Sequence, residues 1–176
     1  MTMTYRTKTY IAADWTGDTD AIDQLHKWND SNYWGLSFND AHDITQSNDS
    51  SLNCSIKASL AMRLDVSKTF VLIVGRNTKS LTSGACFLCA GYSKDFYGNI
   101  KCNNGHSISN KSFIEYECDK AVRDELNIVV LYNAATIDKS KCPDAVKNTG
   151  NHKAMCYYQN GKYYWDYQTV KTALGQ

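Results

Sequence analysis

The chain has almost no excess charge of either sign. Its 176 residues include 19 Lys plus Arg and 18 Asp plus Glu, which gives a formal net charge of +1. No run of basic residues is interleaved with aromatic residues, the pattern typical of a surface that binds nucleic acid. We therefore expect no nucleic acid partner.

The sequence also lacks long apolar runs and a recognisable export signal. No apolar run approaches the roughly 20 residues that span a bilayer, and residues 1–8 are polar, unlike a signal peptide. The seven cysteines are odd in number, so without an export signal reduced thiols or a metal site fit better than disulfides. We expect a cytoplasmic protein with no membrane partner.

The sequence does contain a regular alternation of apolar runs and helical patterns. The length fits a single domain over residues 1–176. Strands are predicted at residues 9–13, 34–38, 69–75, 128–132 and 154–158, and a last helix at 163–174. Residues 69–75 are apolar on both faces, as the central strand of a covered parallel sheet is. The alternation predicts an α/β, doubly wound open sheet of about five parallel strands with helices on both faces.

Residues 77–110 interrupt this alternation with a segment rich in Gly, Cys, Asn and Ser. Segments of this length are usually functional, disordered or held by a metal ion. The spacing of Cys86, Cys89, Cys102 and His106 could complete a tetrahedral zinc shell. The segment has only one Cys-x-x-Cys pair, however, and free cysteine is a common small core residue. Both interpretations remain open for the four residues.

The helical pattern at residues 112–122 is the most informative part of the chain. Its apolar residues recur at i, i+4, i+7 and i+8 and predict a stripe that faces the sheet. The stripe comprises Ile114, Cys118, Ala121 and Val122. Glu117 falls at its edge, one turn after Phe113, so a carboxylate and an aromatic ring would share the rim of a cleft. The alternative for Glu117 is a surface carboxylate in an early helix turn.

Further polar residues follow the predicted strands, where open parallel sheets bind their ligands. Asp14 and Trp15 follow the first strand, Asp40 and His42 the second, and Arg76 the third. All five are candidate substrate contacts. Asp14 could equally begin a turn beside which Trp15 packs, and a loop histidine such as His42 is often bonded to neighbouring carboxylates.

The order of elements, together with four motifs, resembles the TIR domain, and more narrowly the bacterial TIR-like family that includes the TIR proteins of Thoeris antiphage systems. The motifs are KTYIA at 8–12, FNDAHD at 38–43, FVLIVGRNT at 70–78 and SFIEYEC at 112–118. The resemblance implies a flavodoxin-like (TIR-like) fold. It also implies NAD glycohydrolase or ADP-ribosyl cyclase activity, with Glu117 as the catalytic carboxylate and Phe113 beside the nicotinamide. No Gly-x-Gly-x-x-Gly fingerprint is present, so NAD would be a substrate and not a hydride-carrying cofactor.

The same resemblance implies an ADP-ribose-derived signal, cyclic in our expectation, that activates a separate effector. Enzymatic TIR domains often complete their sites across a subunit interface, so a homo-oligomer is expected. The rival interpretation is a non-catalytic TIR adaptor that binds other proteins through residues 39–51. A flavodoxin-like module that binds FMN or phosphate is disfavoured, because residues 14–20 are acidic and lack a phosphate cradle.

Overall fold

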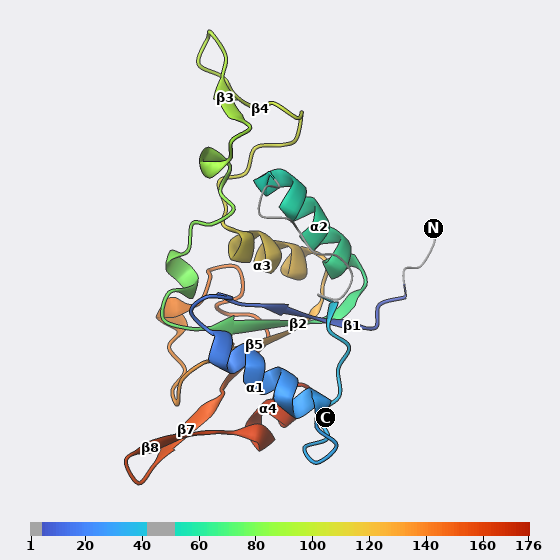
Figure 1. The fold of residues 1–176 in the computed structure, drawn as a ribbon, viewed down its shortest axis with the longest axis vertical. Coiled ribbons are helices and arrows are strands. Elements are labelled where there is room, and N and C mark those ends of the chain that lie inside the picture. Colours follow the sequence, from blue (N-terminus) through green and yellow to red (C-terminus); the bar gives the residue numbers. More distant parts are fainter. Residues whose placement is uncertain (1–4, 42–51) are drawn as a thin grey trace.

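The computed structural model describes residues 5–41 and 52–176 and has a parallel β-sheet at its centre (Figure 1). The sheet has four strands in the order β1 (Lys8–Ala12), β2 (Ser67–Val74), β5 (Asn127–Tyr132) and β6 (Asn151–Ala154). Every neighbouring pair is parallel. The predicted α/β open parallel sheet is confirmed, and the strongly apolar β2 has a strand on each side.

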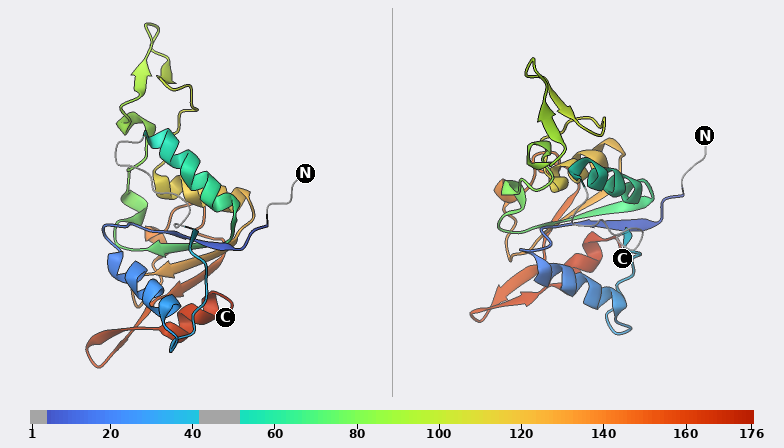
Figure 2. Two further views of the ribbon diagram at one scale, coloured as in Figure 1. Left: turned by 45° about the vertical axis from the view of Figure 1, so that its right-hand side comes forward. Right: turned by 45° about the horizontal axis from the view of Figure 1, so that its top comes forward.

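Helices cover both faces of the sheet, as Figures 1 and 2 show. One face carries α2 (Asn53–Asp65) and α3 (Phe113–Arg123), and the other carries α1 (Thr19–Asp30) and α4 (Tyr167–Ala173). Alternate residues of β2 point to opposite layers: Phe70 belongs to the α2/α3 core and Val71 to the α1/α4 core. Burial on both faces explains why β2 reads as a continuous apolar run.

The predicted second strand at 34–38 does not form. An isolated parallel bridge between Thr9 and Asp40 takes its place beside β1. The backbone of this segment is hydrogen-bonded by side-chain amides: Asn29 bonds both the N–H and the carbonyl of Phe38, and Gln176 does the same for Ser37. Since those groups are already satisfied, they do not join a ladder, and the described residues form a sheet of four strands, one fewer than predicted.

The C-terminal region also differs from its prediction. Residues 154–158 are not one strand. β6 ends at Ala154, and β7 (Cys156–Gln159) pairs antiparallel with β8 (Lys162–Trp165). Asn160 and Gly161 join them with φ of 51° and 77°, the positive values of a two-residue Asn-Gly hairpin turn. The last helix therefore begins at Tyr167, capped by Asp166, which accepts from the Thr169 N–H at 3.0 Å.

The segment 77–110 is built from short elements and protrudes from the α2/α3 side (Figure 1). It contains 3-10 turns at Thr78–Ser80 and Cys86–Leu88 and a hairpin of β3 (Tyr92–Lys94) and β4 (Ile100–Cys102). Helix α2 holds the base of this segment by hydrogen bonds. The ammonium of Lys57 donates to the carbonyls of Ser109 and Lys111 at 3.2 and 2.8 Å, and Asn53 Nδ2 donates to the carbonyl of Ala85 at 2.9 Å.

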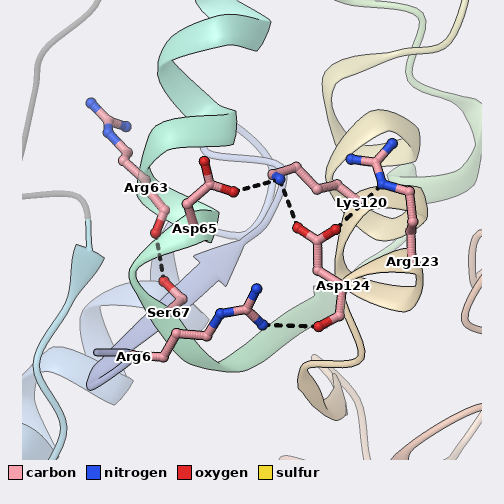
Figure 3. A network of polar contacts seen from close by, with 7 residues as sticks. All are labelled: Arg6, Arg63, Asp65, Ser67, Lys120, Arg123 and Asp124. Atoms are coloured by element: carbon pink, nitrogen blue, oxygen red, sulfur yellow. Dashed lines mark hydrogen bonds and ion pairs between the residues drawn. The ribbon is translucent and has the colours of Figure 1, made fainter. Parts of the chain in front are cut away.

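A polar network links α2 and α3 near the amino ends of the strands (Figure 3). Lys120 Nζ lies 2.6 Å from both Asp65 Oδ1 and Asp124 Oδ2. Burial opposes the charge on Lys120, but the two carboxylates outweigh it and raise its pKa. Arg6 adds a hydrogen bond to the carbonyl of Asp124 at 2.9 Å. The network ties the two helices together at the edge opposite the carboxyl ends of the strands.

In the ranges 5–41 and 52–176, no helix is long and apolar enough to cross a membrane.

Candidate functional site

Glu117 is buried between α3 and β1, with only 6% of its surface exposed. Its carboxylate Oε1 accepts a hydrogen bond of 2.5 Å from the hydroxyl of Tyr10, itself fully buried on β1. Burial raises the pKa of Glu117 to about 7, and the Tyr10 bond and the charge of Arg63 only partly offset it. The sequence predicts this helix position but not its depth, nor Tyr10 as a partner. The one available signal is a tyrosine in a buried strand, because a buried hydroxyl needs a hydrogen-bond partner.

Phe113 begins α3 one turn before Glu117. Its predecessor Ser112 caps the helix in a capping box with Glu115, which fixes where α3 starts. The Phe113 N–H donates to the carbonyl of Ser83 at 2.8 Å. A Cβ atom on Gly84 would lie 2.5 Å from Cδ1 of Phe113, so the segment 77–110 packs directly on this ring. The ring is partly buried against the α2/α3 core.

Neither of two surface pockets formed at opposite edges of the sheet has Glu117 or Phe113 in its wall. Ala41, which belongs to the same buried cluster as Tyr10, precedes the segment 42–51. That segment contains the candidate His42 and lies outside the described residues.

Asp14 adopts the turn geometry that the sequence left open. Its Oδ1 accepts from the Thr16 N–H at 3.1 Å, and its carbonyl accepts from the Asp18 N–H at 2.8 Å. Gly17 approaches the Asp14 carboxylate so closely that a Cβ atom there would collide with it. Trp15 is exposed in the same turn. Neither side chain lines either pocket.

Asp40 lies beside β1 and contacts α1. Its Oδ2 is 3.3 Å from Nε2 of His26, and its side chain is mostly buried. The sequence interpretation grouped Asp40 with His42 and overlooked His26. The sequence does not point to His26, because its partner Asp40 lies 14 positions further along the chain, after the predicted second strand.

Arg76 lies in a pocket at the carboxyl ends of β2 and β5, the edge predicted for ligand binding. The pocket has a volume of about 610 Å³. Other walls come from the segment after β5 and from β8, including Asn133, Lys141 and Tyr164. The structure thus divides the predicted residues between two places: Glu117 and Phe113 lie inside the α2/α3 layer, and Arg76 lies in this open pocket.

Asp18 is a buried carboxylate at the same edge that the sequence did not single out. It occupies the N-cap position of α1 and accepts from Asn133 Nδ2 at 3.0 Å. Burial raises its pKa, while the Asn133 bond opposes the rise. Gly75 allows this placement, because a Cβ atom there would collide with the Asp18 carboxylate. In the sequence, Gly75 directly after β2 is the one sign that another group approaches the backbone there.

The four residues with zinc-like spacing are not brought together. Cys86 Sγ accepts from the Ser109 N–H at 3.1 Å, while Cys102 Sγ lies 3.9 Å from Cys54 Sγ. Across the described parts of the chain, no group of three or more His, Cys, Asp or Glu residues is placed to hold a metal ion. The donors Cys86, Cys89, Cys102 and His106 therefore do not fit a zinc ion in this arrangement.

The fold defines a class. A parallel sheet with paired helices on each face is an α/β fold of the flavodoxin type. Residues 10–83 match the model of the family described as Thoeris protein ThsB, TIR-like domain. This match supports a Thoeris-type TIR-like domain and a TIR-type role in antiphage defence. Comparison with curated proteins gives no match.

Proposed function

We propose that this TIR-like domain cleaves the bond between nicotinamide and ribose in NAD, with Glu117 as the catalytic carboxylate. The observation that carries the proposal is the state of Glu117: a buried carboxylate with a pKa of about 7, one turn after Phe113, bonded to Tyr10. Strongly perturbed titratable groups cluster at functional sites. The helix and the spacing are those that the TIR resemblance implies for a catalytic glutamate.

The proposed chemistry suits a single carboxylate. Loss of nicotinamide develops positive charge on the ribose, and an ionised Glu117 beside the anomeric carbon stabilises that charge in a water-poor environment. The positive charge in turn lowers the pKa of Glu117 and favours its ionised form. Nicotinamide leaves as a neutral ring, so a second carboxylate acting as a general acid is dispensable.

The nucleophile then decides the product. Water gives ADP-ribose, whereas an adenine nitrogen or a ribose hydroxyl of the same molecule gives a cyclic product. We propose a cyclic ADP-ribose signal that activates a separate effector, as the TIR resemblance implies.

Access to Glu117 requires a rearrangement, which we propose occurs on assembly. Ser83 and Gly84 of the segment 77–110 cover Phe113, and Glu117 is nearly inaccessible in the single chain. Contact with a second copy that displaces this cover would open the site to NAD. The enzyme would then be silent as a monomer and active as a homo-oligomer.

One observation favours a second candidate function. Because Glu117 lines neither pocket, the bond from Tyr10 could be a structural contact within a non-catalytic TIR adaptor. In that case antiphage defence would depend on a protein partner and not on NAD turnover.

Mass spectrometry of small molecules separates the two functions. Concentrated protein and extracts of phage-infected cells are incubated with NAD, using wild type, Glu117→Gln and the matched Glu125→Gln. Glu125 is exposed in the turn after α3. Nicotinamide and an ADP-ribose derivative that appear with wild type and Glu125→Gln but not with Glu117→Gln support the enzyme. Defence that survives Glu117→Gln without any such product supports the adaptor.

A further inference from the structure

The 610 Å³ pocket that contains Arg76 has a size typical of small-molecule sites. It lies beyond the carboxyl ends of β2 and β5, where open parallel sheets bind ligands. Neither Glu117 nor Phe113 contributes to its wall. A ligand in this pocket would therefore be held by residues other than the proposed catalytic ones.

One wall of the pocket is aromatic. Tyr163, Tyr164 and Trp165 are consecutive residues of β8, and all three line it. Tyr164 stacks on Tyr157 of β7, with ring centroids 5.4 Å apart and an interplanar angle of 20°. Trp165 packs edge to face on Trp28 at 6.5 Å. The Tyr164 ring, supported by Tyr157, offers a surface on which a planar base can stack, while Trp165 anchors β8 on the α1/α4 core.

A second wall carries cationic side chains. Arg76 is exposed two residues after the end of β2, and no other described residue is bonded or paired with its guanidinium. A guanidinium with free N–H groups is the side chain best shaped for bidentate contact with a phosphate. Lys141 lines the same pocket, 3.7 Å from Asp138 Oδ2.

Two carboxylates complete the lining and narrow the ligand class. Asp20 Oδ1 accepts from Asn133 Nδ2 at 3.0 Å, and Asp138 Oδ1 accepts from the Ser140 N–H at 3.0 Å. The second oxygen of Asp20 can accept a bond from a sugar hydroxyl, as acidic residues do for ribose, and that of Asp138 can do so beside Lys141. Two acidic groups beside the two cations disfavour a bare anion, because they cancel the net charge of the pocket.

We infer that this pocket binds a ribonucleoside phosphate, with the base on the aromatic wall, the ribose at the carboxylates and the phosphate at Arg76. The inference goes beyond the proposed NAD cleavage and does not depend on it. It gives the chain a nucleotide site apart from Glu117, at which a nucleotide could be sensed or held.

Isothermal titration with AMP, adenosine and inorganic phosphate tests the inference. We expect wild type to bind AMP, Arg76→Gln to bind it at least 10-fold more weakly with unchanged affinity for adenosine, and Tyr164→Leu to lose affinity for both. Arg123→Gln, an exposed arginine on α3, is the matched control and should bind AMP as wild type does. Circular dichroism melting verifies that each variant is folded.

Three results would overturn the inference. They are no AMP binding by folded wild type at millimolar concentration, equal weakening by Arg76→Gln and Arg123→Gln, and displacement of AMP by an equal concentration of inorganic phosphate. Binding to Glu117→Gln separates this site from the proposed catalytic one. Retained AMP affinity in that variant supports the inference even if NAD is never cleaved, and lost affinity would place AMP at Glu117 instead.

Discussion

The hydroxyl of Tyr10 on β1 donates a 2.5 Å hydrogen bond to Glu117 on α3, inside the layer between the sheet and the helix. The bond favours the ionised carboxylate, and burial opposes ionisation more strongly, so the pKa of Glu117 is raised to about 7. Both the stability of the domain and the proposed chemistry depend on this balance.

The first prediction concerns stability and pH. The pKa of Glu117 rises from an ordinary 4.5 to about 7 on folding, so the folded state holds its proton more tightly. The stability of wild type therefore falls as pH rises between these two values. Glu117→Gln carries no such penalty. Its free energy of unfolding relative to wild type should increase by about 3 kcal/mol from pH 4 to pH 8, at ~1.4 kcal/mol per pKa unit.

Urea unfolding at several pH values measures this difference. Glu125→Gln is the control, since its carboxylate is exposed and its relative stability should stay flat. A Glu117→Gln difference that does not change with pH would mean that Glu117 ionises freely in the folded chain.

The second prediction concerns Tyr10. Tyr10→Phe removes the hydrogen bond from this hydroxyl to Glu117, so the pKa of Glu117 should rise further, by about one unit. Carboxyl carbon NMR titration detects the change, with Glu117→Gln identifying the signal. Tyr116→Phe, on the same helix, should leave the midpoint unchanged. Equal midpoints in Tyr10→Phe and wild type would show that the bond contributes nothing to the ionisation.

The third prediction concerns the cover over Phe113. Gly84 and Gly98 both have positive φ, at 98° and 82°, but only Gly84 faces another residue. Gly98→Ala should cost about 1 kcal/mol for the backbone conformation alone. Gly84→Ala should cost about 1–3 kcal/mol more, because its methyl group overlaps Phe113. Equal costs in thermal or urea unfolding would contradict the close packing. Hydrogen exchange at the Phe113 amide should quicken only in Gly84→Ala.

The fourth prediction compares two lysines that pair with aspartates. Lys120 has 8% of its side chain exposed and bridges Asp65 and Asp124, whereas Lys111 is 58% exposed and pairs with Asp119. Lys120→Met should destabilise the domain by about 2 kcal/mol, because the partly buried Asp124 loses its shorter ion pair and keeps only the contact from the exposed Arg123 at 3.3 Å. Lys111→Met should change stability by less than about 0.5 kcal/mol. Similar values for the two in urea unfolding would refute the role of the network in Figure 3.

The strands and helices with strong apolar patterns were predictable from the sequence. β2 is apolar on both faces because both are covered, and α3 buries Ile114, Cys118 and Ala121 of its predicted stripe. Val122, predicted in the same stripe, is 38% exposed. The second strand was not predictable in the same way. Its alternating pattern is real, but the side chains of Asn29 and Gln176 take its backbone hydrogen bonds, and Gln176 lies 139 positions away. In the C-terminal hairpin, the sequence does contain a turn signal, Asn160-Gly161.

The candidate site was predictable only in part. The position of Glu117 on its helix follows from local periodicity, and the position of Arg76 after β2 follows from the strand. The bond from Tyr10 could not be predicted, because it joins residues 107 positions apart and depends on how α3 seats on β1. The pocket around Arg76 could not be predicted from the sequence either, because one of its walls is β8, whose residues were expected to be helical.

The rate of nicotinamide release from NAD by the concentrated chain tests the proposed catalytic role of Glu117 most directly. Wild type and Glu125→Gln should release nicotinamide at equal rates that rise as pH increases through about 7. Glu117→Gln, folded by circular dichroism, should be slower by at least about 100-fold. Release by Glu117→Gln at the wild-type rate, or no release by an assembled wild type in infected-cell extract, would contradict it.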